Sequence, residues 1–258
     1  MTLHLPDITL CVFAGNRIAL TAAALSDTFA KLSFDRVMIF ADKDFDAPAA
    51  DVVVTPFSSM EDATRIAWRE VYPRLTTTHA LWMQWDGYPM RPDLWTEAFR
   101  EYDFIGPVWP WFTTYSVGNT GFSLQSRKLL RAVYEDRSIV LRQPEDINIC
   151  RIFRPYLEQR HGIRFASEVI ADWFGIEHGP AYPKSFGVHG LWNLLYFMND
   201  DEMKARMDML APAQWNNERM ISTVGLRAMI AGRRELYRWI VQRQTDMKNG
   251  AMKVGEKI

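Results

Sequence analysis

Little in this sequence points to a specialised class of protein. The 258 residues include only two cysteines, Cys11 and Cys150, whose spacing fits no metal or redox motif, so we expect free, buried thiols in a reducing compartment. No apolar run approaches the roughly 18 residues that a membrane-spanning helix needs, and no leader-peptide pattern opens the sequence. The net charge of −1 provides no field that would attract nucleic acid. We therefore expect a cytoplasmic globular protein without a nucleic-acid partner.

Tryptophan, by contrast, is abundant, with ten residues in the chain. Indole rings stack on the apolar faces of sugars and on bases, and they also serve as large core residues. Both interpretations stay open for Trp109 and Trp111, which we consider as stacking residues together with Phe122.

Strand-like and helical patterns alternate in the first half of the chain. Apolar, strand-like runs lie at residues 8–13, 36–41, 51–55, 80–85 and 104–109, and helical patterns lie at 17–32 and 59–71. This alternation predicts an α/β fold, with a mostly parallel sheet flanked by helices and ligands at the carboxyl ends of the strands. Asp42 follows the second strand and is therefore a candidate contact for the base or ribose of a nucleotide.

Helical patterns dominate after residue 126. We expect helices at 127–134 and 145–159, two minor strands at 164–165 and 169–171, and helix throughout 200–248. The simplest organisation is a catalytic-type α/β domain over residues 1–198, followed by a helical C-terminal appendix over residues 199–258.

The first chemical motif is Asp86-Gly87, directly after the strand-like run that ends at Trp85. A carboxylate at the carboxyl end of a strand can hold a divalent cation that bridges a pyrophosphate. The alternative is ordinary turn chemistry, because Asp-Gly is a common turn dipeptide.

The second motif, residues 117–124, surrounds Asn119 with Gly118 and Gly121. Glycine allows the backbone to approach a ligand closely, and the alternative is a plain β-turn. The segment is not a nucleophile elbow, because it lacks Gly-x-Ser-x-Gly. It is not a phosphate-binding P-loop either, because no Gly-Lys-Ser/Thr follows.

Two further motifs carry titratable groups. Glu145 and Asp146 lie at an expected helix start, where acids either complement the helix dipole or act as a general base on a sugar hydroxyl. His189 lies between Gly187 and Gly190, a setting that suits an imidazole presented to a ligand or metal. A lone histidine is more often structural, and that alternative stays open.

In this order, the four motifs resemble the DUF5672 family of unknown function, which has a GT-A-like, glycosyltransferase-like character. The resemblance rests on Gln84-Trp85-Asp86-Gly87, Gly118-Asn119-Thr120-Gly121-Phe122-Ser123-Leu124, Pro144-Glu145-Asp146 and Phe186-Gly187-Val188-His189-Gly190. The layout is also similar to that of the β-1,3- and β-1,4-galactosyltransferases. This resemblance implies that Asp86 ends a metal-binding Asp-x-Asp motif, that Asp146 is the base of an inverting reaction and that His189 is another metal ligand.

Two positions depart from that pattern. The residues before Asp86 are Gln84 and Trp85, so the first aspartate of Asp-x-Asp is missing, and Thr120 stands where a glycine is expected. The missing aspartate removes one expected metal ligand and so weakens the expected metal site. Thr120, being larger than glycine, narrows the expected donor pocket.

The sequence therefore favours an inverting glycosyltransferase that moves a sugar from a nucleotide sugar to the hydroxyl of a glycan, lipid-linked or small-molecule acceptor. Mn²⁺ or Mg²⁺ would bind Asp86 and His189, Asp146 would act as the base, and Glu145 would orient a sugar hydroxyl. The expected donor contacts are Asp42, Asp86, Trp109, Trp111, Gly118, Asn119 and Gly121. The alternative is a non-catalytic nucleotide- or carbohydrate-binding protein of the same fold, which the missing first aspartate favours.

Basic residues concentrate near the C-terminus, where residues 217–258 hold nine Lys or Arg against four Asp or Glu. Apolar residues recur at helical spacing between positions 220 and 241, a pattern typical of a basic amphipathic helix on an anionic membrane surface. The alternative is a helix packed on the protein with solvated arginines. Peripheral membrane contact through the C-terminal helices is thus an open expectation.

Overall fold

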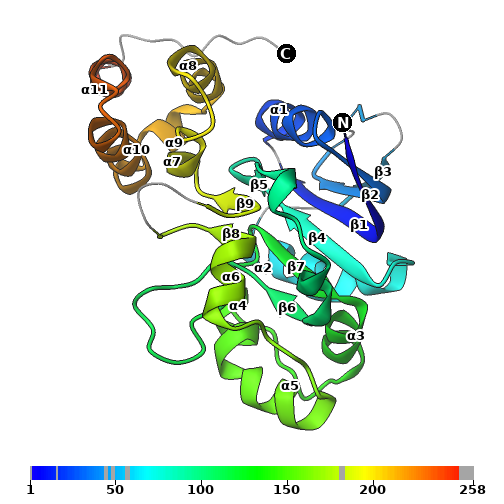
Figure 1. Cartoon of the computed structure of the whole chain (residues 1–258). Helices are drawn as coiled ribbons and strands as arrows, with labels where there is room; N and C mark the ends of the chain where they lie inside the picture. Colours follow the sequence, from blue (N-terminus) through cyan, green and yellow to red (C-terminus); the bar gives the residue numbers. More distant parts are fainter. Residues whose placement is uncertain are drawn as a thin grey trace. The chain divides into compact units, whose positions relative to one another are not determined.

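The computed structural model describes residues 2–15, 17–43, 46–47, 50–55, 59–179 and 184–249 (Figure 1). The chain divides into two compact units. The first comprises residues 1–179 and 184–189, and the second comprises residues 180–183 and 190–258. The second unit thus includes residues before position 199, where we expected a helical appendix to start.

A six-stranded sheet in the order β3-β2-β1-β4-β7-β6 forms the centre of the first unit (Figure 1). Its strands are β1 (Leu3–Gly15), β2 (Leu32–Ala41), β3 (Asp51–Val54), β4 (His79–Met83), β6 (Phe104–Ile105) and β7 (Ser123–Ser126). Strands β1 to β4 pair in parallel, whereas β7 is antiparallel to both β4 and β6. The expected mixed α/β fold with a mostly parallel sheet is therefore confirmed.

The middle strands of this sheet are buried and mainly apolar where both faces of the sheet are covered. From Ile8 onward every residue of β1 is buried, and so is every residue of β4. Trp82 of β4 stacks on Phe13 of β1, with ring centroids 4.5 Å apart, and on Phe40 of β2 at 5.8 Å. The core thus runs across three neighbouring strands.

The helical elements of the first half are α1 (Ile18–Phe29), α2 (Met60–Arg65), η1 (Ile66–Glu70), η2 (Tyr72–Arg74), η3 (Pro92–Leu94), η4 (Glu97–Glu101) and α3 (Arg127–Glu135). Side-chain caps start α2, η4 and α3 among these elements. Ser59 caps α2 through a capping box with Asp62. Ser126 caps α3 by accepting a hydrogen bond from the backbone N–H of Leu129.

The expected helix over residues 145–159 is wrong as a single element. The segment forms α4 (Glu145–Ile147), a π-helical turn η5 (Asn148–Ile152) and α5 (Arg154–His161). Pro155 has no N–H and tolerates only the first turn of a helix, so a new helix begins there.

The expected minor strands are also wrong. Residues 169–171 lie inside α6 (Glu168–Phe174), whose first turn is capped by Ser167. Phe165 makes only an isolated bridge with Phe104. Val169 is 66% exposed whereas Ala171 is buried, because the two side chains lie on different faces of the helix.

A second, three-stranded sheet has the order β5-β9-β8. It consists of β5 (Gly87–Pro89), β8 (Gly175–Ile176) and β9 (Gly187–His189). Strand β9 pairs antiparallel with β5, where Gly87 faces His189, and parallel with β8. These short strands bring three segments that are far apart in sequence to one place.

The second unit is helical. Its helices are α7 (Leu191–Leu194), α8 (Asp200–Asp208), α9 (Pro212–Trp215), α10 (Glu218–Ile230) and α11 (Arg234–Lys248). Gly232 has a φ of 74° between α10 and α11 and allows the chain to turn there. Among the described residues, no helix has both the length and the apolar character needed to cross a bilayer.

Candidate functional site

Asp86 lies in a tight turn that joins β4 to β5. Backbone hydrogen bonds between Gln84 and Gly87, 2.9 and 3.1 Å long, close this turn. The Asp86 side chain is 15% exposed, and its Oδ1 atom has no hydrogen-bond partner among the described residues. Burial raises the pKa of this carboxyl, and the charges of His189 and Arg17 oppose that shift. The turn therefore presents a buried carboxylate oxygen without a hydrogen-bond donor.

The His189 imidazole faces this oxygen, with Nε2 3.9 Å from Oδ1 of Asp86. The ring is packed against two glycines. A Cβ at Gly121 would lie 2.2 Å from Nε2, and a Cβ at Gly87 would lie 2.4 Å from Cδ2. Neither glycine has a positive φ, so their role here is to leave space for the ring. Glycines from two separate motifs thus position the histidine.

Glu177 is the site residue that the sequence did not reveal. Its Oε1 atom lies 3.2 Å from Nδ1 of His189, and His178 Nε2 lies 3.3 Å from its Oε2. Glu177 directly follows β8, and His189 ends the parallel neighbour β9, so the strand pairing sets them side by side. The two-residue strand β8 has no distinct pattern in the sequence, so Glu177 could not be assigned to the site from sequence alone.

The His189–Glu177 pair changes the pKa values of both groups. Burial alone would lower the pKa of His189, but the charge and hydrogen bond of Glu177, together with Asp86 and Asp146, raise it to about 9. Burial alone would raise the pKa of Glu177, but His189 and His178 hold it well below its usual range. With a pKa of about 9 the imidazole carries a hydrogen on both nitrogens at neutral pH, so Nδ1–H points at Glu177 and Nε2–H faces Asp86. A cation at Nε2 would have to displace that second hydrogen, whereas the hydrogen on Nδ1 would stay with Glu177.

The segment around Asn119 joins this group to the acids of α4. Asn119 has a φ of 66°, and its Nδ2 atom lies 2.6 Å from Glu177 Oε2 and 3.0 Å from His189 Nδ1. The next residue, Thr120, donates a 2.8 Å hydrogen bond to Oε1 of Glu145. The positive φ therefore falls on the asparagine and not on the flanking glycines, a difference from the expectation.

Asp146 neighbours Glu145 at the start of α4. Burial, then the charges of Glu145 and Glu177, raise the pKa of Asp146 to about 6. A carboxylate with this pKa is largely ionised at neutral pH and can still accept a proton during a reaction.

Asp86 and His189 are the two side chains of this cluster that could hold a divalent cation. Four carboxylates, those of Asp86, Glu145, Asp146 and Glu177, act electrostatically on one imidazole or on one another. Oδ1 of Asp86, which has no hydrogen-bond partner in the described part of the chain, faces Nε2 of His189. The other ring nitrogen of this histidine is held by the Glu177 carboxylate, an arrangement that is common at metal-binding histidines. Within the described ranges, no group of three or more His, Cys, Asp or Glu is arranged to hold a metal. A cation here would thus have two protein ligands and take the others from water or substrate.

The residues that we expected to contact the donor differ in how exposed they are. Asp42 is exposed just after β2, and its backbone N–H lies 3.4 Å from the Gly15 carbonyl at the end of β1. Trp109 is only 4% exposed, and its ring fills the space where Gly118 would carry a Cβ. Trp111 is 54% exposed. Trp109 is therefore a buried packing residue, whereas about half of the Trp111 side chain is accessible to a ligand.

The stacking role expected for Phe122 is wrong, because this residue is fully buried. Its ring stacks on Phe174 at 4.8 Å and leaves space only for glycine at positions 175 and 187. Phe122 is a core residue beneath the small sheet.

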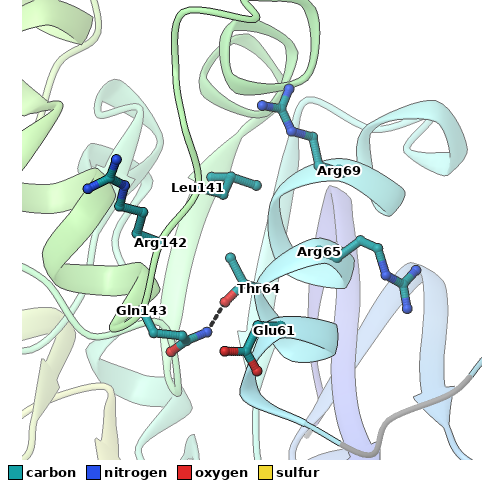
Figure 2. A pocket seen from close by; sticks show the side chains of 7 residues that line it. All are labelled: Glu61, Thr64, Arg65, Arg69, Leu141, Arg142 and Gln143. Carbon is teal, nitrogen blue, oxygen red and sulfur yellow. Dashed lines mark hydrogen bonds between the residues drawn. The ribbon is translucent and has the colours of Figure 1, made fainter.

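A pocket of about 380 Å³ lies between α2 and the segment that precedes the acids. Its lining residues are Glu61, Thr64, Arg65, Arg69, Leu141, Arg142 and Gln143. Figure 2 shows the hydrogen bond from Gln143 to Thr64 across the pocket, whereas the guanidinium groups of Arg65 and Arg142 point away from each other. Arg69 donates to three backbone carbonyls and is structural. The volume suits a small ligand, but none of the expected site residues lines this pocket.

These observations define a mixed α/β protein with a buried acid–imidazole cluster beside its small sheet. Residues 52–189 match the family described as "Protein of unknown function (DUF5672)". That span is more than half of the 258-residue chain, so the chain belongs to the DUF5672 family.

Other comparisons add little. No curated protein matches the chain. One similar solved structure is described as a glycosyltransferase involved in the glycosylation of the major capsid of PBCV-1. It is 10% identical with a TM-score of 0.39, and the alignment covers 77% of this chain and 98% of that one. A likeness this low bears on neither mechanism nor substrate.

Proposed function

We propose that this protein is an inverting glycosyltransferase that uses a nucleotide-sugar donor and a divalent cation, Mn²⁺ or Mg²⁺. The observation that carries the proposal is the buried Oδ1 of Asp86, which has no hydrogen-bond partner among the described residues and lies 3.9 Å from Nε2 of His189, whose Nδ1 lies beside Glu177. An anionic diphosphate would be repelled by so many carboxylates unless a cation lay between them. The missing first aspartate is offset by the histidine as a second ligand.

In this proposal the donor lies across the carboxyl ends of β1, β2 and β4. Asp42 contacts its base or ribose, and the backbone of the 118–121 segment lies against its diphosphate. Asp86 and His189 would hold the cation, which would supply positive charge opposite the departing diphosphate. Glu177 accepts from Nδ1 of the imidazole and from the side-chain amide of Asn119, so that Nε2 stays directed at that position.

Asp146 takes the proton of the acceptor hydroxyl as its oxygen attacks the anomeric carbon. The new C–O bond forms while the bond from that carbon to the diphosphate breaks, and the diphosphate leaves with the electron pair. Glu145, which accepts a hydrogen bond from Thr120, orients a sugar hydroxyl nearby. The raised pKa of Asp146 supports its role as the base.

A thermal-shift series tests donor and metal binding together. We expect at least one nucleotide sugar to raise the melting temperature in the presence of Mn²⁺, because only a ligand of the folded state stabilises it. Asp86→Ala and His189→Ala should each remove the Mn²⁺-dependent part of the shift and keep the fold. If both variants respond like the wild type, the metal site is elsewhere.

A further inference from the structure

Large aromatic rings are exposed on the loop of residues 109–115, which we call the aromatic loop. Trp111 is 54% exposed and Tyr115 is 39% exposed, and the exposed Thr113 and Thr114 lie between them. No charged residue occurs in this loop. The surface thus combines ring faces with hydroxyl groups and has no charge of its own.

The loop is held rigidly by its own backbone. An isolated bridge between Val108 and Val117 closes its base, and the Trp109 N–H donates a 2.8 Å hydrogen bond to the Ser116 carbonyl. The Ser116 hydroxyl in turn bonds the Glu168 carboxylate on α6. These contacts fix the start and the end of the loop.

Two arginines support the loop from below. The guanidinium of Arg151 lies 3.5 Å from the centre of the Phe112 ring, and it donates hydrogen bonds to the backbone carbonyls of Thr114 and Tyr115. Arg154 lies 5.0 Å from the centre of the Tyr115 ring. Both cations are used in cation–π contacts, so the Phe112 and Tyr115 rings are ordered before any ligand arrives. Trp111 packs edge-on against the Phe112 ring, with centroids 6.1 Å apart.

The aromatic loop borders the acid–imidazole cluster. The Trp111 ring lies 4.8 Å from the His178 ring, and His178 Nε2 lies 3.3 Å from Glu177. Glu177 in turn contacts His189. A ligand on Trp111 would therefore lie beside the site where the proposed transfer takes place.

We propose that the aromatic loop binds a neutral sugar unit of a carbohydrate acceptor. Trp111 stacks on the C–H face of the sugar, and the hydroxyls of Thr113 and Thr114 bond its hydroxyls. A neutral surface next to a strongly acidic cluster favours a neutral glycan over a charged donor. This inference rests on the proposed glycosyltransferase function and narrows its acceptor to a carbohydrate, so Trp111 contacts the acceptor and not the donor.

Saturation-transfer NMR on the full chain, without nucleotide, tests this assignment with neutral oligosaccharides (maltotetraose, cellotetraose, chitotetraose and galactotetraose). We expect at least one to bind, and Trp111→Ala to weaken that binding at least about tenfold, which corresponds to about 1.4 kcal/mol. Trp111→Phe should retain most of it. Trp173→Ala is the matched control, because this residue is 62% exposed on α6 outside the loop. Binding by none of the sugars, or equal weakening by Trp111→Ala and Trp173→Ala, overturns the proposal.

Two further measurements separate this proposal from others. The rise in melting temperature that a nucleotide sugar causes with Mn²⁺ should be unchanged in Trp111→Ala. Loss of this rise would show that Trp111 contacts the donor and would overturn the acceptor assignment. Sugar binding without any donor binding would keep the loop assignment and reject the transferase. Binding to phosphatidylcholine vesicles that depends on Trp111, with no sugar binding, would overturn the proposal in favour of a lipid.

Discussion

At the scale of single residues, Asp146 links activity to pH. Its pKa of about 6 means that the carboxylate needed as a base forms as the pH rises through that value. We expect turnover to rise with pH across this range. Asp146→Asn should keep donor binding and lower turnover roughly 10²–10⁴-fold, the usual contribution of a general base. Near-normal turnover would place the base elsewhere, with Glu145 as the first alternative.

Asp146→Asn, which should lower turnover, should raise the stability of the folded protein at neutral pH. Between the unfolded pKa of 3.8 and about 6, the folded protein keeps a proton that the unfolded chain has released, so stability falls as the pH rises through this window. Asp146→Asn removes this loss. Above pH 6 it should be more stable than the wild type by up to about 3 kcal/mol, because one pKa unit is about 1.36 kcal/mol. Urea unfolding measures the difference, which should disappear below pH 4; an equal difference at both pH values would contradict the assignment.

Glu177 should control metal binding without being a ligand. We expect Glu177→Ala to weaken Mn²⁺ binding about 10–100-fold, because the imidazole loses the carboxylate that holds Nδ1. The Mn²⁺ affinity of Glu177→Gln should lie between those of the wild type and Glu177→Ala, since the amide oxygen of glutamine can still accept a hydrogen bond from Nδ1. Calorimetry with Mn²⁺ and a nucleoside diphosphate gives the affinities, and Glu158→Gln, on α5, serves as the control. Unchanged affinity in Glu177→Ala would show that Nδ1 needs no such partner.

Site residues could be predicted where local sequence carries a signal. Asp86 follows a clear strand and His189 lies among glycines, so both could be identified from sequence. Glu177 could not, because β8 has only two residues and is recognisable only by its pairing with β9. Trp109 and Trp111 look alike in the sequence, and tertiary packing alone buries one and exposes the other.

At the scale of elements, two glycines determine where His189 lies. Gly121→Ala and Gly87→Ala should each displace the imidazole, because the new Cβ would lie 2.2 or 2.4 Å from its ring. We expect loss of Mn²⁺ binding in both variants, measured by calorimetry. Gly225→Ala in α10 is the control, because its Cβ would meet Tyr237 at an ordinary 3.5 Å. That change should slightly stabilise the helix. Intact Mn²⁺ binding in the first two variants would mean that the ring is not confined by these glycines.

Elements with strong local patterns were predicted well, and those defined by tertiary context were not. The apolar strands β1 to β4 and helix α3 lie close to their expected positions. The expected helix over residues 59–71 starts as expected, but it changes to a π-helical turn, η1, after Arg65. The 145–159 segment looked like one helix because a π-helical turn has no distinct sequence pattern. Residues 169–171 are apolar and two of them are β-branched, which is typical of a strand. They nevertheless form a helix, whose first turn is stabilised by the Ser167 cap.

At the scale of the whole molecule, the C-terminal unit bears on the expected membrane contact. Four apolar residues of the expected amphipathic face are buried within this unit: Ile221, Val224, Leu236 and Ile240. Arg233 pairs with Asp200 at 2.6 Å, and Arg227 and Arg243 also have partners in the unit. Lys253, Lys257 and Glu256, which contribute to the basic balance, lie outside the described residues.

Membrane contact would have to use the outer face of α10. Leu226, Met229 and Ile230 share one helix face and are 59%, 52% and 61% exposed. The membrane prediction requires salt-sensitive co-sedimentation with anionic but not neutral vesicles, lost in Ile230→Glu. This substitution is a sharper test than truncation after Asn216, which would remove the buried residues of α10 and α11. Absence of binding at low salt would reject the contact.

The central claim is that this chain breaks the bond between a sugar and a diphosphate. Release of nucleoside diphosphate from a panel of nucleotide sugars with Mn²⁺, with and without a neutral oligosaccharide, measures this step. We predict release by the wild type with at least one donor, faster with an acceptor, and loss of that release in Asp146→Asn although the donor still binds. Binding of a nucleotide sugar without any diphosphate release would contradict the account and identify a non-catalytic binding protein.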